Sequence, residues 1–129
     1  MYQLTAIEEE LCKEIVDCAF QVHKQLGPGL LEKINEACFC HELKKRAIAF
    51  ECQKSIPIFY DDLEFDEGLR IDVYVEEKII CELKAVETVN PLWQAQVLSH
   101  LKLTGYHVGS VINFNVSLLK NGIRRYCLE

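Results

Sequence analysis

Three charged residues in two neighbouring segments have the types and spacing that phosphoryl chemistry needs. Asp72 lies in the segment Arg70 to Val75, and Glu82 and Lys84 lie in the segment Ile79 to Ala85. Both segments are rich in β-branched and other apolar residues, which predicts two strands. Paired carboxylates bind Mg²⁺ together with substrate phosphate, and a nearby ammonium stabilises charge that develops on that phosphate. The sequence therefore suggests metal-assisted chemistry at a phosphate ester.

A tight turn at residues 76–78 fixes the register of this predicted hairpin and brings Asp72 opposite Glu82. Like charges that face each other on paired strands repel, at a cost of some tenths of a kcal/mol up to about 1 kcal/mol. A bound cation reverses the sign of that interaction. Because strand side chains alternate between faces, Lys84 shares the face of Glu82. We therefore expect the two carboxylates and the lysine to form one cluster.

The hairpin is predicted to have one apolar and one charged face. The apolar layer consists of Ile71, Val73, Val75, Ile79, Cys81, Leu83 and Ala85. The other face collects Arg70, Asp72, Tyr74, Ile80, Glu82 and Lys84. A simpler interpretation stays open, in which this face is solvated and Arg70 and Lys84 neutralise the acids diagonally. Exposed ion pairs of that kind are common and contribute little to stability.

The remaining segments predict an α/β fold around the hairpin. Apolar residues recur every three or four positions from about Ile7 to Leu26, which indicates an amphipathic helix, and Gly27-Pro28-Gly29 ends it. The full predicted order is ααββββαββ, with helices over 7–26, 30–46 and 91–104 and strands over 49–53, 55–60, 69–75, 79–85, 107–114 and 123–128.

Length and composition are typical of an ordinary globular protein. With 129 residues, half of them apolar, the chain is expected to form a single domain over residues 1–129. No apolar run approaches the ~20 residues of a membrane span. The first twenty residues are acidic and helix-periodic, unlike a signal peptide. We therefore expect a cytoplasmic protein without a membrane partner.

Charge and cysteine content exclude two other classes of protein. The net charge of -6 argues against bulk electrostatic coating of nucleic acid, although Lys44 to Arg46 and Arg124 with Arg125 form local basic clusters. Seven cysteines with no Cys-x-x-Cys pair do not suggest a disulfide framework. Cys38 and Cys40 point about 200° apart on a helix, so a shared zinc ion is not expected.

The Asp72 and Glu82-Leu83-Lys84 pattern resembles the PD-(D/E)XK nuclease signature, an Asp on one strand and Glu-x-Lys on the next. A wider set of segments resembles the GxxExxY family of that superfamily. These segments are Leu26 to Glu32, Ile56 to Tyr60, Glu82 to Glu87, Leu101 to Gly105 and Ile112 to Phe114. The resemblance implies a restriction-endonuclease-like mixed sheet flanked by helices and metal-dependent cleavage of a nucleic-acid phosphodiester.

The resemblance also implies roles for individual residues. Asp72, Glu82 and the backbone carbonyl of Leu83 would bind Mg²⁺ or Mn²⁺, and Lys84 would be the catalytic lysine. Glu32 takes the place of the family's helix acid, and Gln96 matches a glutamine that orients substrate or the lysine. DNA is favoured over RNA as the substrate. The resemblance also allows a homodimer, although no residue in the sequence requires one.

Simpler interpretations of these supporting residues stay open. An acid in the first turn of a helix, such as Glu32, gains about 0.3 to 1 kcal/mol from the helix dipole alone. Gln96 and His100 are four residues apart on one helix face and could both point to the cleft, although a polar outer face is the ordinary explanation. A lone Trp93 near a helix start could stack on a base but is more often core packing.

The sequence departs from the family at one residue. Asn35 stands where the family has its tyrosine, three residues after Glu32. This departure and the acidic net charge keep a second function open, a catalytically inactive module that binds nucleic acid or protein on the same fold. A domain for protein interaction without metal is a third option.

Overall fold

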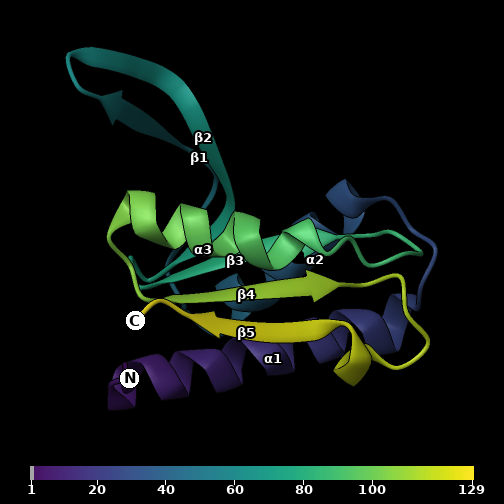
Figure 1. Cartoon of the computed structure of the whole chain (residues 1–129). Coiled ribbons are helices and arrows are strands. Elements are labelled where there is room, and N and C mark those ends of the chain that lie inside the picture. The colour runs from purple at the N-terminus through teal and green to yellow at the C-terminus, as the bar shows by residue number, and fades with distance from the viewer. Residues whose placement is uncertain (1) are drawn as a thin grey trace.

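The computed structural model describes residues 2–129, which form a five-stranded mixed sheet with helices on both faces (Figure 1). The helices are α1 (Ala6–Leu26), α2 (Glu32–Lys45) and α3 (Leu92–Thr104), with a short 3-10 helix η1 (Leu119–Asn121). The strands are β1 (Phe50–Tyr60), β2 (Leu63–Val75), β3 (Ile79–Lys84), β4 (Val108–Asn113) and β5 (Ile123–Cys127).

The strands lie in the sheet in their sequence order, β1 to β5. Neighbouring strands are antiparallel except β3 and β4, which are parallel. Parallel strands need a long crossover, and α3 provides it. The predicted α/β class is confirmed, with one difference in the number of strands. The expected strands 49–53 and 55–60 form one continuous β1, so three strands rather than four precede α3.

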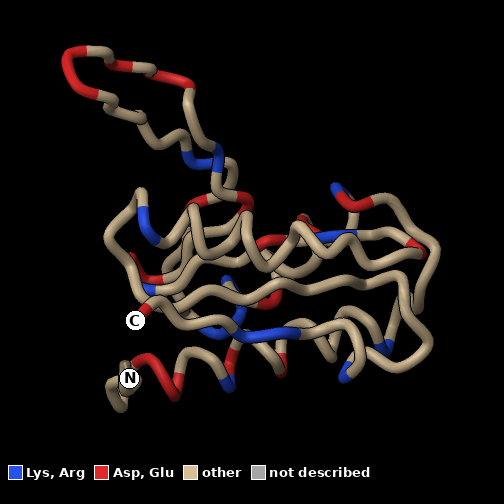
Figure 2. The backbone as a smooth tube through the Cα atoms, viewed as in Figure 1, with Lys and Arg blue, Asp and Glu red and all other residues tan. Residues whose placement is uncertain are grey.

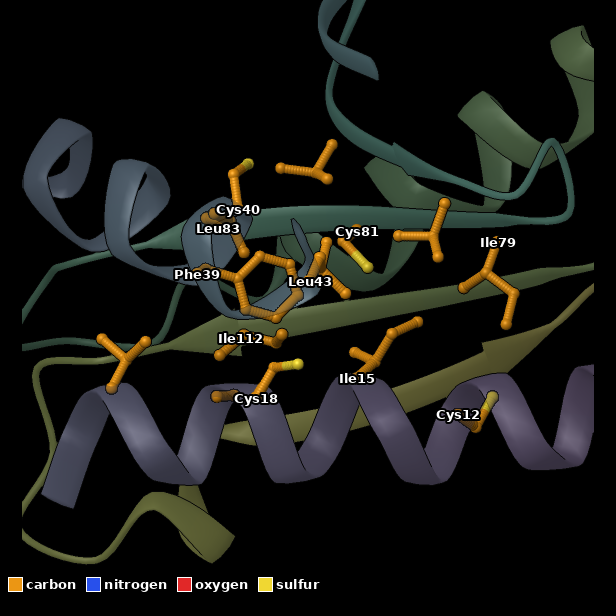
Figure 3. Close-up of a cluster of buried hydrophobic side chains, with 14 of the residues drawn as sticks. Cys12, Ile15, Cys18, Phe39, Cys40, Leu43, Ile79, Cys81, Leu83 and Ile112 are labelled. Atoms are coloured by element: carbon orange, nitrogen blue, oxygen red, sulfur yellow. The ribbon is translucent and has the colours of Figure 1, made fainter. Parts of the chain in front are cut away.

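The largest core lies between the sheet and the pair α1 and α2 (Figure 3). The amphipathic periodicity of α1 places Ile15 and Cys18 against the sheet, where both are fully buried. Phe39 and Leu43 of α2 fill the space beside them. A capping box at Thr5 fixes where α1 begins, because the Glu8 N–H donates to the Thr5 hydroxyl oxygen.

A smaller core lies under α3 on the opposite face of the sheet. It contains Tyr74 and Ile80 from the hairpin and Leu101 from α3. Ile71 also belongs to this smaller core. The sequence had placed it in the apolar layer of Val73 on the other face. The face predicted to collect the charged residues is therefore covered by α3 at Tyr74 and Ile80.

β1 and β2 extend beyond the body of the protein as a two-stranded arm (Figure 1). Its outer part is acidic, with Asp61 and Asp62 at the turn and Glu64, Asp66 and Glu67 on the returning strand (Figure 2). No Lys or Arg occurs between Pro57 and Leu69. No helix among residues 2–129 is long and apolar enough to cross a bilayer.

Candidate active site

The turn between β2 and β3 sets the register that was predicted for this hairpin. Val75 pairs with Ile79, and Lys78 donates its N–H to the Val75 carbonyl at 2.9 Å. Glu76 and Glu77 both adopt left-handed backbone, with φ of 51° and 55°, which closes the turn tightly. The regular ladder runs only to Val73 and Cys81. Asp72 and Glu82 follow directly where the two strands stop pairing.

Asp72 continues the contact between the strands with its side chain. Its Oδ2 accepts the N–H of Leu83 at 2.9 Å. In a strand the N–H and C=O of one residue point to the same edge, so the Leu83 carbonyl is directed toward the side of Asp72. The carboxylate therefore lies beside a backbone oxygen and next to Glu82.

Glu82 is a buried carboxyl group, with 7% of the residue exposed. Burial raises its pKa, the neighbouring charge of Asp72 raises it further, and a hydrogen bond with His100 opposes both effects. The contact joins Glu82 Oε1 and His100 Nδ1 at 2.7 Å. An ionised carboxylate can only accept, so His100 carries the Nδ1 proton in that state. His100 thus orients Glu82 from α3.

Lys84 ends β3 on the same face as Glu82. Its Nζ lies over the ring of Trp93, 5.7 Å from the centroid, which is a cation–π distance. Its positive charge lowers the pKa of Glu82 and so favours the ionised carboxylate. The aromatic ring holds the flexible lysine stem at the edge of the carboxylate cluster.

Glu32, the first residue of α2, is exposed, and the charges of Asp72, Lys84 and Glu82 affect the pKa of its carboxyl. Partial burial raises its pKa, the charge of Asp72 adds to that rise, and Lys84 opposes it. The structure therefore brings Glu32 within range of the charges of Asp72 and Lys84. Gln96 is exposed on α3, one turn before His100. Within residues 2–129 its side chain forms no hydrogen bond.

Comparison with known protein families gives one match that covers nearly the whole chain. The model of the PD-(D/E)XK nuclease superfamily matches residues 9–126. The chain belongs to the PD-(D/E)XK nuclease superfamily. No curated protein and no solved structure matches it. Superfamily membership supports a nuclease-like function, and the Asp72 and Glu82-Leu83-Lys84 pattern lies inside the matched region.

The oxygen atoms at this end of the hairpin suit a hard divalent cation. Asp72 and Glu82 each use one oxygen in a hydrogen bond, and the second oxygen of each forms no hydrogen bond with residues 2–129. With the Leu83 carbonyl they make a set of oxygen donors, which Mg²⁺ prefers. Among residues 2–129 no group of three or more His, Cys, Asp or Glu side chains is placed to hold a metal ion together. An ion at Asp72 and Glu82 would therefore take its remaining ligands from the Leu83 carbonyl, water and substrate.

Two contacts of the site were not expected from the sequence. His100 reaches Glu82 and Trp93 reaches Lys84, although each also has an ordinary explanation on a helix surface. The spacing of four between Gln96 and His100 was the only sequence signal for the first contact. Nothing in the sequence around Trp93, the single tryptophan of the chain, predicted its contact with Lys84.

Asn35, which the GxxExxY resemblance aligns with a tyrosine, does not line the cluster with an exposed polar group. It is buried in α2, with 1% exposed, and its Oδ1 has no hydrogen-bond partner among residues 2–129. A buried amide oxygen without a partner is energetically costly.

Cys40, which the sequence did not suggest as a zinc ligand, packs against β1. Its Sγ lies 2.9 Å from Cys52 Sγ.

Proposed function

We propose that this protein is a metal-dependent nuclease of the GxxExxY family that hydrolyses phosphodiester bonds, with DNA placed ahead of RNA. Superfamily membership supports the reaction class. The observation that carries the proposal is the buried Glu82 carboxyl beside Asp72, because crowding two acids at a buried site is unfavourable without a cation. Mg²⁺ or Mn²⁺ is the proposed cofactor.

The second oxygens of Asp72 and Glu82 and the carbonyl of Leu83 would hold the cation. When bound, it would supply a Lewis acid for the scissile phosphate and its attacking water. Lys84 contributes an ammonium that stabilises negative charge developing on the phosphate. Glu32, the helix acid that the resemblance implies, is proposed to help hold the ion, and its carboxyl has a pKa raised mainly by burial. Gln96, exposed on α3, is proposed to contact the substrate.

The direct test is cleavage of end-labelled DNA and RNA by the pure protein in Mg²⁺ or Mn²⁺, with EDTA as the blank. Asp72→Asn and Lys84→Ala are each expected to lower the cleavage rate by at least a hundredfold, the scale of one electrostatic group in a site. Glu77→Gln, in the exposed turn of the same hairpin, is the matched control and should cut normally. Failure of the wild type to cut any substrate, or full activity in both variants, would refute the catalytic role.

A binding module without turnover is the second candidate function. The buried Asn35 in place of the family tyrosine and the acidic arm favour it. Calorimetric titration with Mn²⁺ and a gel-shift assay separate the two functions. Binding of metal and nucleic acid by a protein that never cuts would favour the module, and cleavage would exclude it.

A further inference from the structure

A pocket of about 200 Å³ opens on the α3 face of the sheet, beside the carboxylate cluster. It lies where the start of α3 meets the end of β4 and the start of β5. Its lining includes Trp93, Val111, Asn113, Asn121, Arg124 and Tyr126. The site described above uses none of these residues except Trp93.

Strand register places this pocket next to the cluster. Glu82 pairs with Val111 across β3 and β4, and Val111 pairs with Arg124 across β4 and β5. Directly paired residues project from the same face of a sheet, so the three form one row. Neighbouring strands lie about 4.8 Å apart, which puts the Arg124 backbone roughly 10 Å from that of Glu82.

Trp93 connects the cluster and the pocket. Its ring lies under Lys84 Nζ and also lines the pocket. Tyr126 supplies a second aromatic ring from β5. A phosphate held by Lys84 would therefore lie beside a cavity that two aromatic residues line.

The polar groups around the pocket favour an anionic strand. Arg124 is exposed and forms no ion pair with any other residue between 2 and 129, its only hydrogen bond going to the carbonyl of Ile123. Asn121 is exposed beside it, and both side chains are available as donors. The pocket lining contains no carboxylate, in contrast to the groove between α1 and β5, which contains Glu9 and Asp17.

We propose that this pocket receives one unstacked nucleobase, next to the phosphate that Lys84 holds. The inference rests on the proposed function and adds a substrate class to it. Base stacking on aromatic side chains tolerates any sequence because every base has a π-face. Bases inside a duplex cannot reach such a pocket without being turned out of the stack. The preferred substrate is therefore single-stranded nucleic acid, a loop or a frayed end.

The single tryptophan makes the pocket directly observable. Trp93 emission is recorded in EDTA while four probes are added: a 12-nucleotide oligothymidylate, the matching oligouridylate, a 12-nucleotide strand of abasic sites, and a blunt DNA duplex. The two single-stranded oligonucleotides that carry bases should quench the emission of Trp93. The abasic strand and the duplex should not. The DNA and RNA arms identify which sugar the site prefers, and quenching by either supports the pocket.

Variants test the pocket by fluorescence anisotropy of the labelled oligothymidylate. Trp93→Leu and Tyr126→Leu should each weaken binding roughly 10-fold, while Trp93→Phe keeps part of the affinity. Far-ultraviolet circular dichroism checks that each variant folds, and Tyr126→Leu serves if Trp93→Leu does not. Glu77→Gln, in the exposed turn between β2 and β3, is the matched control and should keep the quenching.

Base-dependent quenching without cleavage would support the pocket and refute the nuclease. Cleavage by a protein that binds abasic and normal strands equally, or unchanged binding by the folded variants, would overturn the pocket alone. Absence of binding to every probe would also overturn it.

Discussion

Replacing Asp72 with Asn separates the charge of this residue from its role in the hairpin. The amide oxygen of Asn still accepts the Leu83 N–H, which Asp72 Oδ2 accepts at 2.9 Å. The substitution removes the negative charge that raises the pKa of Glu82 and of Glu32. Relief of this repulsion should stabilise the metal-free protein by some tenths of a kcal/mol up to about 1 kcal/mol.

The same substitution should abolish stabilisation by metal. A ligand present at a hundred times its dissociation constant stabilises the folded state by about 2.7 kcal/mol. For a chain of this length that corresponds to a rise of roughly 10 °C in the melting temperature. The wild type should show this rise in Mn²⁺. Asp72→Asn, with one ligand lost, should melt at nearly the same temperature in Mn²⁺ and in EDTA.

Differential scanning calorimetry in EDTA and in graded Mn²⁺ measures both effects. Glu87→Gln, in the exposed loop after β3, is the control because it changes the net charge by the same amount. Two results would refute the reasoning: a wild type that does not respond to Mn²⁺, or an Asp72→Asn variant less stable than the wild type in EDTA.

Three further predictions concern other parts of the molecule. Burial raises the pKa of Glu82 above 4.5, so the metal-free protein should lose stability as pH rises from about 4.5 through that raised pKa. Urea unfolding at a series of pH values should show a flatter dependence of the unfolding free energy on pH for Glu82→Gln. Diamide should oxidise Cys40 and Cys52, whose sulfurs lie 2.9 Å apart, to a disulfide that stabilises the protein by up to roughly 3 kcal/mol. Mass spectrometry should show a loss of two hydrogens, and Cys52→Ser should prevent that loss. Gly122→Ala should destabilise by about 1 to 3 kcal/mol in urea, because its methyl group would lie 2.2 Å from the Asn113 carbonyl oxygen; unchanged stability would contradict the geometry.

The errors in the predicted elements have local physical causes. The sequence predicted a break at Lys54 between two strands. In the structure Lys54 lies within the edge strand β1, where it pairs with Ile71 and its Nζ lies 5.2 Å from the centroid of the Tyr74 ring. β2 begins at Leu63 rather than Leu69, because acidic residues are tolerated on an arm that solvent surrounds. The change of face at Ile71 coincides with an irregular stretch, where the ladder of β2 and β3 ends at Val73 and Gln53 of β1 has a left-handed backbone with φ of 52°.

The sequence by itself determined the superfamily pattern, the three helices and the register of the hairpin. These depend on alternation and periodicity within short segments, so the turn at residues 76–78 was enough to set the pairs Val75–Ile79, Tyr74–Ile80 and Val73–Cys81. Tertiary structure decided that the charges of Asp72 and Lys84 reach Glu32, that His100 bonds Glu82 and that Trp93 lies under Lys84. Such contacts join distant segments through the way helices pack on the sheet, which no local pattern specifies.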